Sequence, residues 1–415
     1  MFDNVLHQSA TSLLSEDIEK DRLPGSILFS GPSASGKLTC ALELSRVLSC
    51  TGKIRGEWNC TCPSCLKHKA MVSQNVLVAG PGNRTLEIAA AKTTLLSQNA
   101  KNTSHLEAAR YLYLRAVRKL TIRFSSVLWR DDDKLSKFSP LIQSIDENLE
   151  VLTPGRTIPD GDELEKVLDE IEKLTTKLES SFLYDSLPVL QIRNFSEWAH
   201  LSTESGKKVL IIENADSMAE SSRNALLKIL EEPPENTVFI LTTARRGAIL
   251  PTILSRVRTY SFFNRSVAQQ QEVINRVFHY DCVVAGKPIP DSINDFLQTY
   301  FPVSPDTVRY NADLFFKTVA SGHVPDISAI ISVCRNFEPR ELFRIFMEEL
   351  ILFQRPLLGT ASGCEASAKI TAEIRRAFNN VGVYNQNPAA CLEELVRTVL
   401  RIDKIYGGVL GDVLK

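Results

Sequence analysis

Seven residues near the N-terminus, Gly31-Pro-Ser-Ala-Ser-Gly36-Lys37, have the spacing of a phosphate-binding P-loop. In such a loop, backbone N–H groups at a helix start hold phosphate and the lysine offsets its negative charge. The apolar run Ser26–Ser30 precedes the loop, and apolar residues at helical spacing follow it from Thr39. This context favours a strand, a nucleotide loop and a helix over a chance glycine-rich turn, with Gly31, Gly36 and Lys37 as cofactor-binding residues.

The position after the lysine departs from the P-loop pattern. It normally carries a hydroxyl for magnesium, and here it is Leu38. Thr39 comes about 100° further round a helix, so it does not simply replace that hydroxyl. The sequence therefore leaves ATP binding open, and Thr39 joins the nucleotide-binding residues only if nucleotide binds.

An active ATPase of this kind needs two adjacent acids after its third strand. One acts on the metal and the other orients the attacking water. Here the apolar run Val209–Ile212 continues as Glu213, Asn214, Ala215 and Asp216. Asn214 stands at the second position and cannot accept a proton. We therefore expect the chain to hydrolyse ATP very poorly, or not at all, by itself.

Four of the nine cysteines, Cys50, Cys60, Cys62 and Cys65, crowd into one segment with the spacing C-x9-C-x-C-x2-C. Four thiolates on a turn-rich loop suit tetrahedral zinc with a structural role. Such a site leaves no position for an activated water, so catalytic zinc is not expected. Two alternatives stay open: His68 as a substitute fourth ligand, because the close Cys60–Cys62 pair is unusual, or buried cysteines without metal.

The composition is that of an ordinary globular protein. The chain has 415 residues, 44% hydrophobic and 23% charged, which is enough for two or three domains. A formal net charge of −1 means that nucleic-acid contact requires a local patch or a partner. No stretch reaches the roughly 18 apolar residues that span a bilayer, and no signal segment opens the chain. We expect a cytosolic protein with no membrane partner.

Four short apolar runs are the predicted strands that position these residues. They are Ser26–Ser30, Val76–Ala79, Val209–Ile212 and Val238–Leu241. Helical stretches separate the runs, and their nearly continuous apolar character favours a parallel sheet with both faces covered.

Between Thr85 and Leu187 the pattern changes to long amphipathic helices, at about His105–Leu128 and Leu164–Phe182. A turn rich in proline and glycine separates them, so we expect an inserted hairpin or small bundle. A solvated face is the ordinary explanation for the basic residues of the first stretch, and contact with DNA or a partner is the alternative. These residues are Arg110, Arg115, Arg118, Lys119 and Arg123.

The segment from Ser222 to Thr243 carries a resemblance to a known family. It contains Leu-Leu-Lys-Ile-Leu-Glu-Glu-Pro-Pro before a buried strand, and Ser255-Arg256 follows it. This layout resembles the bacterial DNA polymerase III clamp loader, in its gamma/tau and delta-prime family of AAA+ proteins. The resemblance covers roughly Phe2–Val78 and Leu187–Phe263, and the helical C-terminal part only by class.

The resemblance implies roles for the cysteines and for the arginine. The family carries a four-cysteine zinc module at this place, usually C-x8-C-x2-C-x2-C, so one ligand is shifted here. Its Ser-Arg pair projects an arginine into the ATP site of the neighbouring subunit, which makes Ser255 and Arg256 catalytic in trans. A lone arginine would otherwise form only a surface salt bridge. Arg245 and Arg246, near the place of a phosphate-sensing residue, we interpret as solvated loop charges.

The implied fold is an α/β P-loop (AAA+-like) parallel-sheet domain with a structural zinc module and a helical insertion, followed by an all-α lid and an all-α collar domain. We place the AAA+-like domain at 1–263, with the zinc module at about 50–65 and the insertion at about 85–187. The lid then covers 264–322, and the collar, which serves oligomerisation, covers 323–415.

A chain that keeps the arginine and the zinc module but lacks ATPase residues resembles the delta-prime type, a stator and not an enzyme on its own. That type implies a hetero-pentamer with gamma/tau and delta subunits, which loads a sliding clamp onto primed DNA at the bacterial nucleoid. The polymerase activity of the holoenzyme then lies in other subunits. Two alternatives stay open: an ATP-hydrolysing gamma/tau-type subunit, or an unrelated zinc-containing P-loop ATPase.

Overall fold

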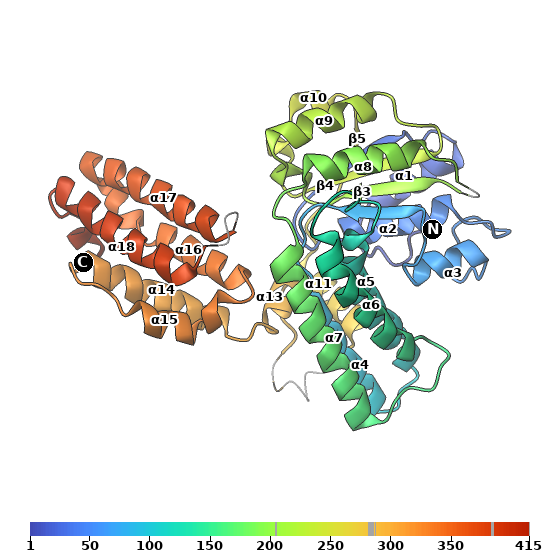
Figure 1. Ribbon diagram of the computed structural model, residues 1–415, viewed down its shortest axis with the longest axis horizontal. Helices are drawn as coiled ribbons and strands as arrows, with labels where there is room; N and C mark the ends of the chain where they lie inside the picture. The colour runs from blue at the N-terminus through green and yellow to red at the C-terminus, as the bar shows by residue number, and fades with distance from the viewer. Residues whose placement is uncertain (204–205, 281–285, 287, 383–385, 415) are drawn as a thin grey trace. The chain divides into compact units, whose positions relative to one another are not determined.

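The computed structural model describes residues 1–203, 206–280, 286, 288–382 and 386–414. The chain divides into two compact units, Met1–Leu297 and Gln298–Lys415. Figure 1 colours the first from blue to yellow-orange and the second from orange to red. The finer division into an AAA+-like domain, a lid and a collar stays a prediction.

A five-stranded parallel sheet forms the centre of the first unit, in the order β2-β3-β4-β1-β5. The strands are β1 Ser26–Ser30, β2 Val76–Ala79, β3 Lys208–Ile212, β4 Thr237–Thr243 and β5 Arg258–Ser261. The four predicted strands are confirmed. The edge strand β5 was not predicted, because only Tyr260 of its residues is buried and no apolar run marks it. All five carboxyl ends meet at one edge of the sheet, where ligands bind in folds of this class.

Helices cover both faces of the sheet because successive strand residues point to opposite sides. Ile27 and Phe29 belong to one core, with residues of α1 and α2. Leu28 belongs to the other, with residues of α8, α9 and the segment between β2 and β3. The helices around the sheet are α1 Ala10–Glu19, α2 Lys37–Leu48, α3 Pro63–Lys69, α8 Val189–His200, α9 Glu220–Glu231 and α10 Pro251–Leu254.

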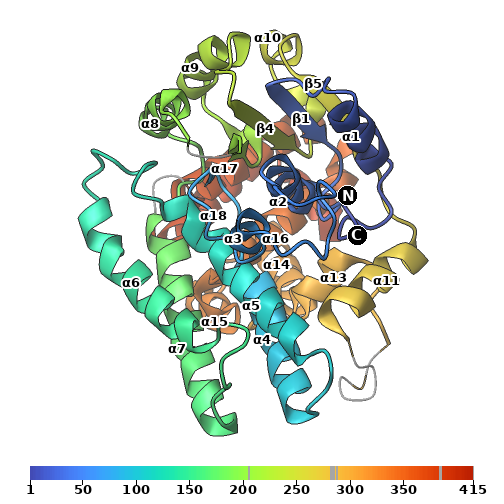
Figure 2. The same cartoon turned by 90° about the vertical axis from the view of Figure 1, so that its right-hand side faces the viewer.

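The segment between β2 and β3 forms a small bundle, as predicted. Its helices are α4 Thr85–Ala100, α5 Leu106–Thr121, α6 Leu135–Val151 and α7 Gly161–Phe182, with a 3₁₀ turn η1 at Ile122–Phe124. In Figures 1 and 2 these helices extend away from the sheet. Trp129 stacks on Phe124, which follows α5, and on Tyr184, which follows α7, and these rings connect the bundle to the chain that returns to the sheet.

The described residues after Phe263 contain helices and no strand, as predicted. The first of these are α11 Val267–Phe278, in the first unit, and α13 Ile293–Gln298, whose last residue begins the second unit. The second unit has a core of its own, made by α14 Pro305–Ala320, α15 Ile327–Val333, α16 Glu341–Leu352, α17 Ala361–Gly382 and α18 Pro388–Ile405. None of the helices in the described part of the chain is long and apolar enough to cross a membrane.

Candidate functional site: the phosphate loop, its acids and the cysteine cluster

The predicted loop lies between β1 and α2, at the carboxyl edge of the sheet. Gly36 has a φ of 93°, in the left-handed region that favours glycine, and Lys37 begins the helix directly after it. The Nζ of Lys37 donates to the carbonyl oxygens of Gly31 and Pro32, at 2.7 and 2.5 Å. The strand, loop and helix follow the predicted order, while nucleotide binding, including any part for Thr39 in the first turn of α2, stays a prediction.

The charge of Lys37 is set by its surroundings. Burial lowers the pKa of this ammonium to about 8, although the carboxylates of Glu213 and Asp216 act in the opposite direction. The ammonium of Lys37 is therefore close enough to both carboxylates for their charges to act on its pKa. Lys37 now binds two carbonyls of the loop. If its ammonium turned away from them, it could offset the negative charge of a bound phosphate.

Arg265, which is not among the predicted site residues, also holds the phosphate loop. Its guanidinium donates to the carbonyl oxygens of Leu6, Ala34 and Ser35 at 2.9 to 3.1 Å. The side chain is almost fully buried. No local pattern marks this residue, because its partners lie about 230 and 260 positions earlier in the chain.

Glu213 directly follows β3, where a metal-binding acid is expected, and two arginines bind it. The Nη2 of Arg84 lies 2.7 Å from one carboxylate oxygen of Glu213, and Arg123 contacts the other. Burial acts to raise the pKa of Glu213, but these guanidinium groups outweigh it and bring the pKa to about 2. The acid is thus ionised, only 13% exposed and paired with two cations of its own chain.

The neighbouring acid positions are also engaged. Asn214 adopts a left-handed conformation, with a φ of 52°, and its side-chain amide donates to the carbonyl of Pro81 at 2.9 Å. Asp216 accepts from Thr243 Oγ1 at 2.8 Å and from Arg245 Nε at 2.9 Å. Arg245 is therefore an exposed loop charge with a definite partner. A carboxylate at the place of Asn214, where a water would be activated, is missing from the described site.

The five basic residues singled out around α5 do not form a solvated face, so that interpretation is wrong. Arg110 is 3% exposed and donates to three backbone carbonyls around Thr153. Arg115 and Arg118 donate to the last carbonyls of α3, Lys119 pairs with Glu87, and Arg123 pairs with Glu213. Each guanidinium or ammonium is used inside the fold. Contact with DNA, the alternative, gains no support from these side chains.

The four cysteine thiols come together as predicted. The sulfur atoms of Cys50, Cys60, Cys62 and Cys65 all lie within 4.8 Å of one another, and the first two are 3.8 Å apart. A tetrahedral zinc with Zn–S bonds of about 2.3 Å requires sulfur separations of about 3.8 Å. A Cβ on Gly52 would lie 2.6 Å from the Cys60 sulfur, so the loop is shaped around the thiols. The cluster can therefore hold a metal ion.

Hydrogen-bond donors surround the thiols in the way that thiolate ligands require. Arg46 Nη1 lies 3.1 Å from the sulfur of Cys65, and the amide of Cys65 lies 3.4 Å from the sulfur of Cys62. Burial acts to raise the pKa of Cys62, but hydrogen bonds from Thr51 and from that amide lower it to about 6. When bound, zinc would be a structural cross-link for these four residues.

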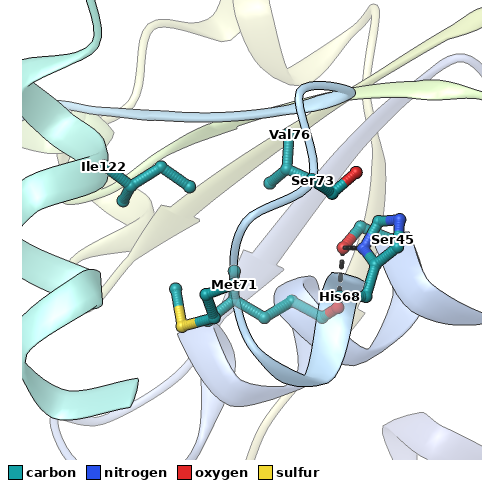
Figure 3. Close-up of a pocket in the computed structure, with 7 residues that line it drawn as sticks. Ser45, His68, Met71, Ser73, Val76 and Ile122 are labelled. Atoms are coloured by element: carbon teal, nitrogen blue, oxygen red, sulfur yellow. Dashed lines mark hydrogen bonds between the residues drawn. The ribbon is translucent and has the colours of Figure 1, made fainter. Parts of the chain in front are cut away.

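His68, considered as a substitute ligand, does not join the cluster. Its Nδ1 lies 3.3 Å from Ser45 Oγ, and the ring lines a small pocket with Met71, Ser73 and Ile122 (Figure 3). Burial lowers the pKa of His68 to about 4, with Arg46 and Arg115 adding to the effect. A neutral histidine packed on α2 fits a supporting position beside the thiols.

Ser255 and Arg256 follow α10 at the surface. Arg256 Nη1 donates to the Thr252 carbonyl at 2.9 Å, and Nη2 lies 3.4 Å from the exposed Glu231 carboxylate. Its side chain is 30% exposed. Exposed pairs of this kind contribute about 0–1 kcal/mol, so the guanidinium can leave Glu231 at little cost.

A family model described as "DNA polymerase III, delta subunit" matches residues 6–126 and 157–266, together more than half of the chain. The match includes residues 85–126 and 157–187 of the predicted insertion, which we had expected to depart from the family pattern, so only 127–156 of that segment lies outside it.

Curated relatives match over shorter segments. The DNA polymerase III subunit delta' of Bacillus subtilis is 42% identical over 66 residues, which is 16% of this chain and 20% of that protein. The subunit delta' of Haemophilus influenzae is 38% identical over 72 residues, 17% of this chain and 22% of that protein. The subunit gamma/tau of Mycobacterium bovis is 44% identical over 86 residues, 21% of this chain and 15% of that protein. The chain thus spans about a fifth of the length of these relatives.

Among solved structures, a DNA polymerase III gamma subunit-related protein from Thermotoga maritima is similar. It is 17% identical, and the match covers 52% of this chain and 80% of that one. The TM-score is 0.28, which is too low to carry an argument about the site.

Proposed function

We propose, because the chain belongs to the DNA polymerase III delta-subunit family, that it is a clamp-loader subunit of the delta-prime type. In this role it binds gamma/tau and delta subunits in a hetero-pentamer and does not hydrolyse ATP itself. It supplies Arg256, with Ser255, to the ATP site of a neighbour while the complex loads a sliding clamp onto primed DNA. The replication proteins that it resembles favour the bacterial cytosol as its location.

The observation that carries the proposal is the amide at position 214. Asn214 cannot activate water, and its side chain is committed to the carbonyl of Pro81. A general base must instead accept a proton from the attacking water. Arg256, by contrast, is half-buried at the surface and lightly held, as a group that acts on another subunit has to be.

The test is a reconstituted complex with gamma/tau-type and delta-type subunits from the same bacterium. Arg256→Ala should assemble at the same stoichiometry but lower the DNA-dependent ATP turnover of the complex and slow clamp loading. Trans-acting arginines contribute about 10³–10⁵ in rate at the site that they serve. Arg246→Ala, at an exposed position of the same surface region, is the matched control and should leave both rates unchanged. Unchanged turnover and loading by Arg256→Ala would rule the role out.

A second candidate is an ATP-hydrolysing subunit of the gamma/tau type. The favouring observations are the retained Lys37 and the segment that is 44% identical to a gamma/tau subunit. The isolated chain distinguishes the two candidates, since only the second predicts ATP turnover that Lys37→Ala abolishes. The third alternative, an unrelated P-loop ATPase, does not agree with the family membership.

A further inference from the structure

The bundle between β2 and β3 supplies two arginines to Glu213, the acid that directly follows β3. We propose that Arg84 and Arg123 take the place of a divalent cation at Glu213, so that the positive charge beside this acid comes from the chain itself and not from a metal ion. Arg84 Nη2 lies 2.7 Å from Glu213 Oε1, and Arg123 contacts Oε2. Two guanidinium groups carry the same formal charge as one Mg²⁺ ion. The inference rests on this geometry and not on the subunit assignment.

The backbone at Arg84 is held in place independently of the contact between its side chain and Glu213. It directly precedes α4, and Glu179 of α7 accepts from its backbone N–H at 2.6 Å and from Thr85 Oγ1 at 2.7 Å. This carboxylate binds donors at the start of α4, where a negative charge is favourable. The bundle's own packing therefore sets the direction of the Arg84 side chain.

Arg123, just after the end of α5, is fixed equally well. It lies in the 3₁₀ turn after α5 and is 2% exposed. Its Nη1 donates to the carbonyl of Gly80 at 3.1 Å, and its own carbonyl accepts from Trp129 Nε1 at 2.7 Å. A buried guanidinium that is hydrogen-bonded at several points is a preorganised partner for a carboxylate.

The backbone leaves room for this pair at Gly82. A Cβ there would lie 2.8 Å from both Arg123 Nη2 and Glu213 Oε2. Any larger residue at this position would push the guanidinium and the carboxylate apart. The Gly80-Pro-Gly82 turn after β2 thus serves the ion pair.

Further charged side chains extend the network around Glu213. Lys119 pairs with Glu87, and Arg84 Nε lies 3.8 Å from the same carboxylate. These side chains are 13–19% exposed, and a network so poorly solvated is sensitive to the loss of one member, because a charge left alone there is unfavourable. Counting Glu179 at the start of α4, three cations (Arg84, Arg123 and Lys119) face three carboxylates (Glu213, Glu87 and Glu179). A divalent ion at Glu213 would therefore have to displace two arginines from a network without net formal charge.

The test compares thermal unfolding of the full chain in EDTA and in millimolar Mn²⁺. The wild-type melting temperature should be the same in both. The double variant Arg84→Met, Arg123→Met should melt lower in EDTA, by on the order of 10 °C, because it removes both guanidinium partners of a carboxylate that is only 13% exposed. Mn²⁺ should then restore part of the loss. Adding Glu213→Gln to the double variant should abolish the Mn²⁺ effect.

Arg130→Met is the matched control, because Arg130 forms an exposed pair with Glu197 beside the same bundle. It should melt within about 2 °C of wild type in both conditions. A double variant as stable as wild type would overturn the proposal.

A second measurement needs no folded double variant. Mn²⁺ binding to the wild-type chain, followed by electron paramagnetic resonance, should show no ion that depends on Glu213. Binding of about one Mn²⁺ per chain that Glu213→Gln removes would overturn the proposal, since the acid would then be open to metal.

Discussion

The guanidinium of Arg265 donates a 2.9 Å hydrogen bond to the carbonyl oxygen of Ala34, in the middle of the phosphate loop. Ala34 has a φ of 56°, a conformation that is unfavourable for a residue with a Cβ. The same guanidinium also binds the carbonyls of Ser35 and Leu6. One arginine after β5 therefore joins the N-terminal segment to the loop and holds a strained backbone without any ligand.

Removal of this arginine should loosen the loop. Arg265→Met leaves three carbonyls without their charged donor, and the hydrogen bond to Ser35 is buried, so we expect a loss of about 2–3 kcal/mol in the free energy of unfolding. Urea unfolding of the full chain measures it. Arg246→Met, at an exposed site, should change the stability by less than about 0.5 kcal/mol. Equal stability of the two variants would show that water replaces the guanidinium without cost.

The cysteine cluster predicts a metal stoichiometry. The purified chain should contain about one zinc per molecule, measured by mass spectrometry of the metal, and Cys65→Ser should lower that content strongly. Cys65 is the buried member of the cluster, so its loss also leaves Arg46 without its sulfur partner. Cys364→Ser, an exposed cysteine of the second unit, is the control and should keep its zinc. A wild-type chain with far less than one zinc would support unmetallated cysteines instead.

The two arginines on Glu213 predict a specific acid sensitivity. The ordinary carboxyl pKa is 4.5 and that of Glu213 in the folded chain is about 2, so only the unfolded state binds a proton between these values. The stabilisation is therefore complete above about pH 4.5 and is lost as the pH falls towards 2. The difference corresponds to about 3 kcal/mol.

Glu213→Gln has no proton to gain at this position and isolates the effect. The stability gap between wild type and this variant should be largest at pH 7 and should narrow towards pH 3. Urea unfolding across that range measures the gap. A gap that stays constant would mean that Glu213 is not held as an anion.

The apolar runs of the central strands identified most of the sheet, because a buried parallel strand needs little more than apolar residues in a row. The edge strand β5 lacks that signal, since Tyr260 is its one buried side chain. The cysteines were found for a similar reason. Their ligand spacing is local, so four residues close in sequence already specify most of a tetrahedral site.

The sequence pattern could not identify the two arginines that bind Glu213. Arg84 and Arg123 lie 129 and 90 positions before it. Periodicity marks the apolar stripe of α5, but it does not reveal that a charged residue beside the stripe points inward to an acid. A charge on an amphipathic helix is solvated by default, and only the packing of the bundle against the sheet reverses that expectation.

The last prediction concerns the lysine of the phosphate loop. Burial lowers the pKa of Lys37 to about 8, so about half of its amines should be neutral at pH 8. A lysine with an ordinary pKa is less than about 1% neutral there and reacts correspondingly slowly with an acylating reagent. Competitive labelling across pH 6–11, read by mass spectrometry of the Lys37 peptide, should therefore give a midpoint near 8. Glu213→Gln provides the internal check: this carboxylate favours the charged ammonium, so its removal should move the midpoint lower still. A midpoint near the ordinary value of 10.5 would mean that Lys37 leaves the loop carbonyls for solvent.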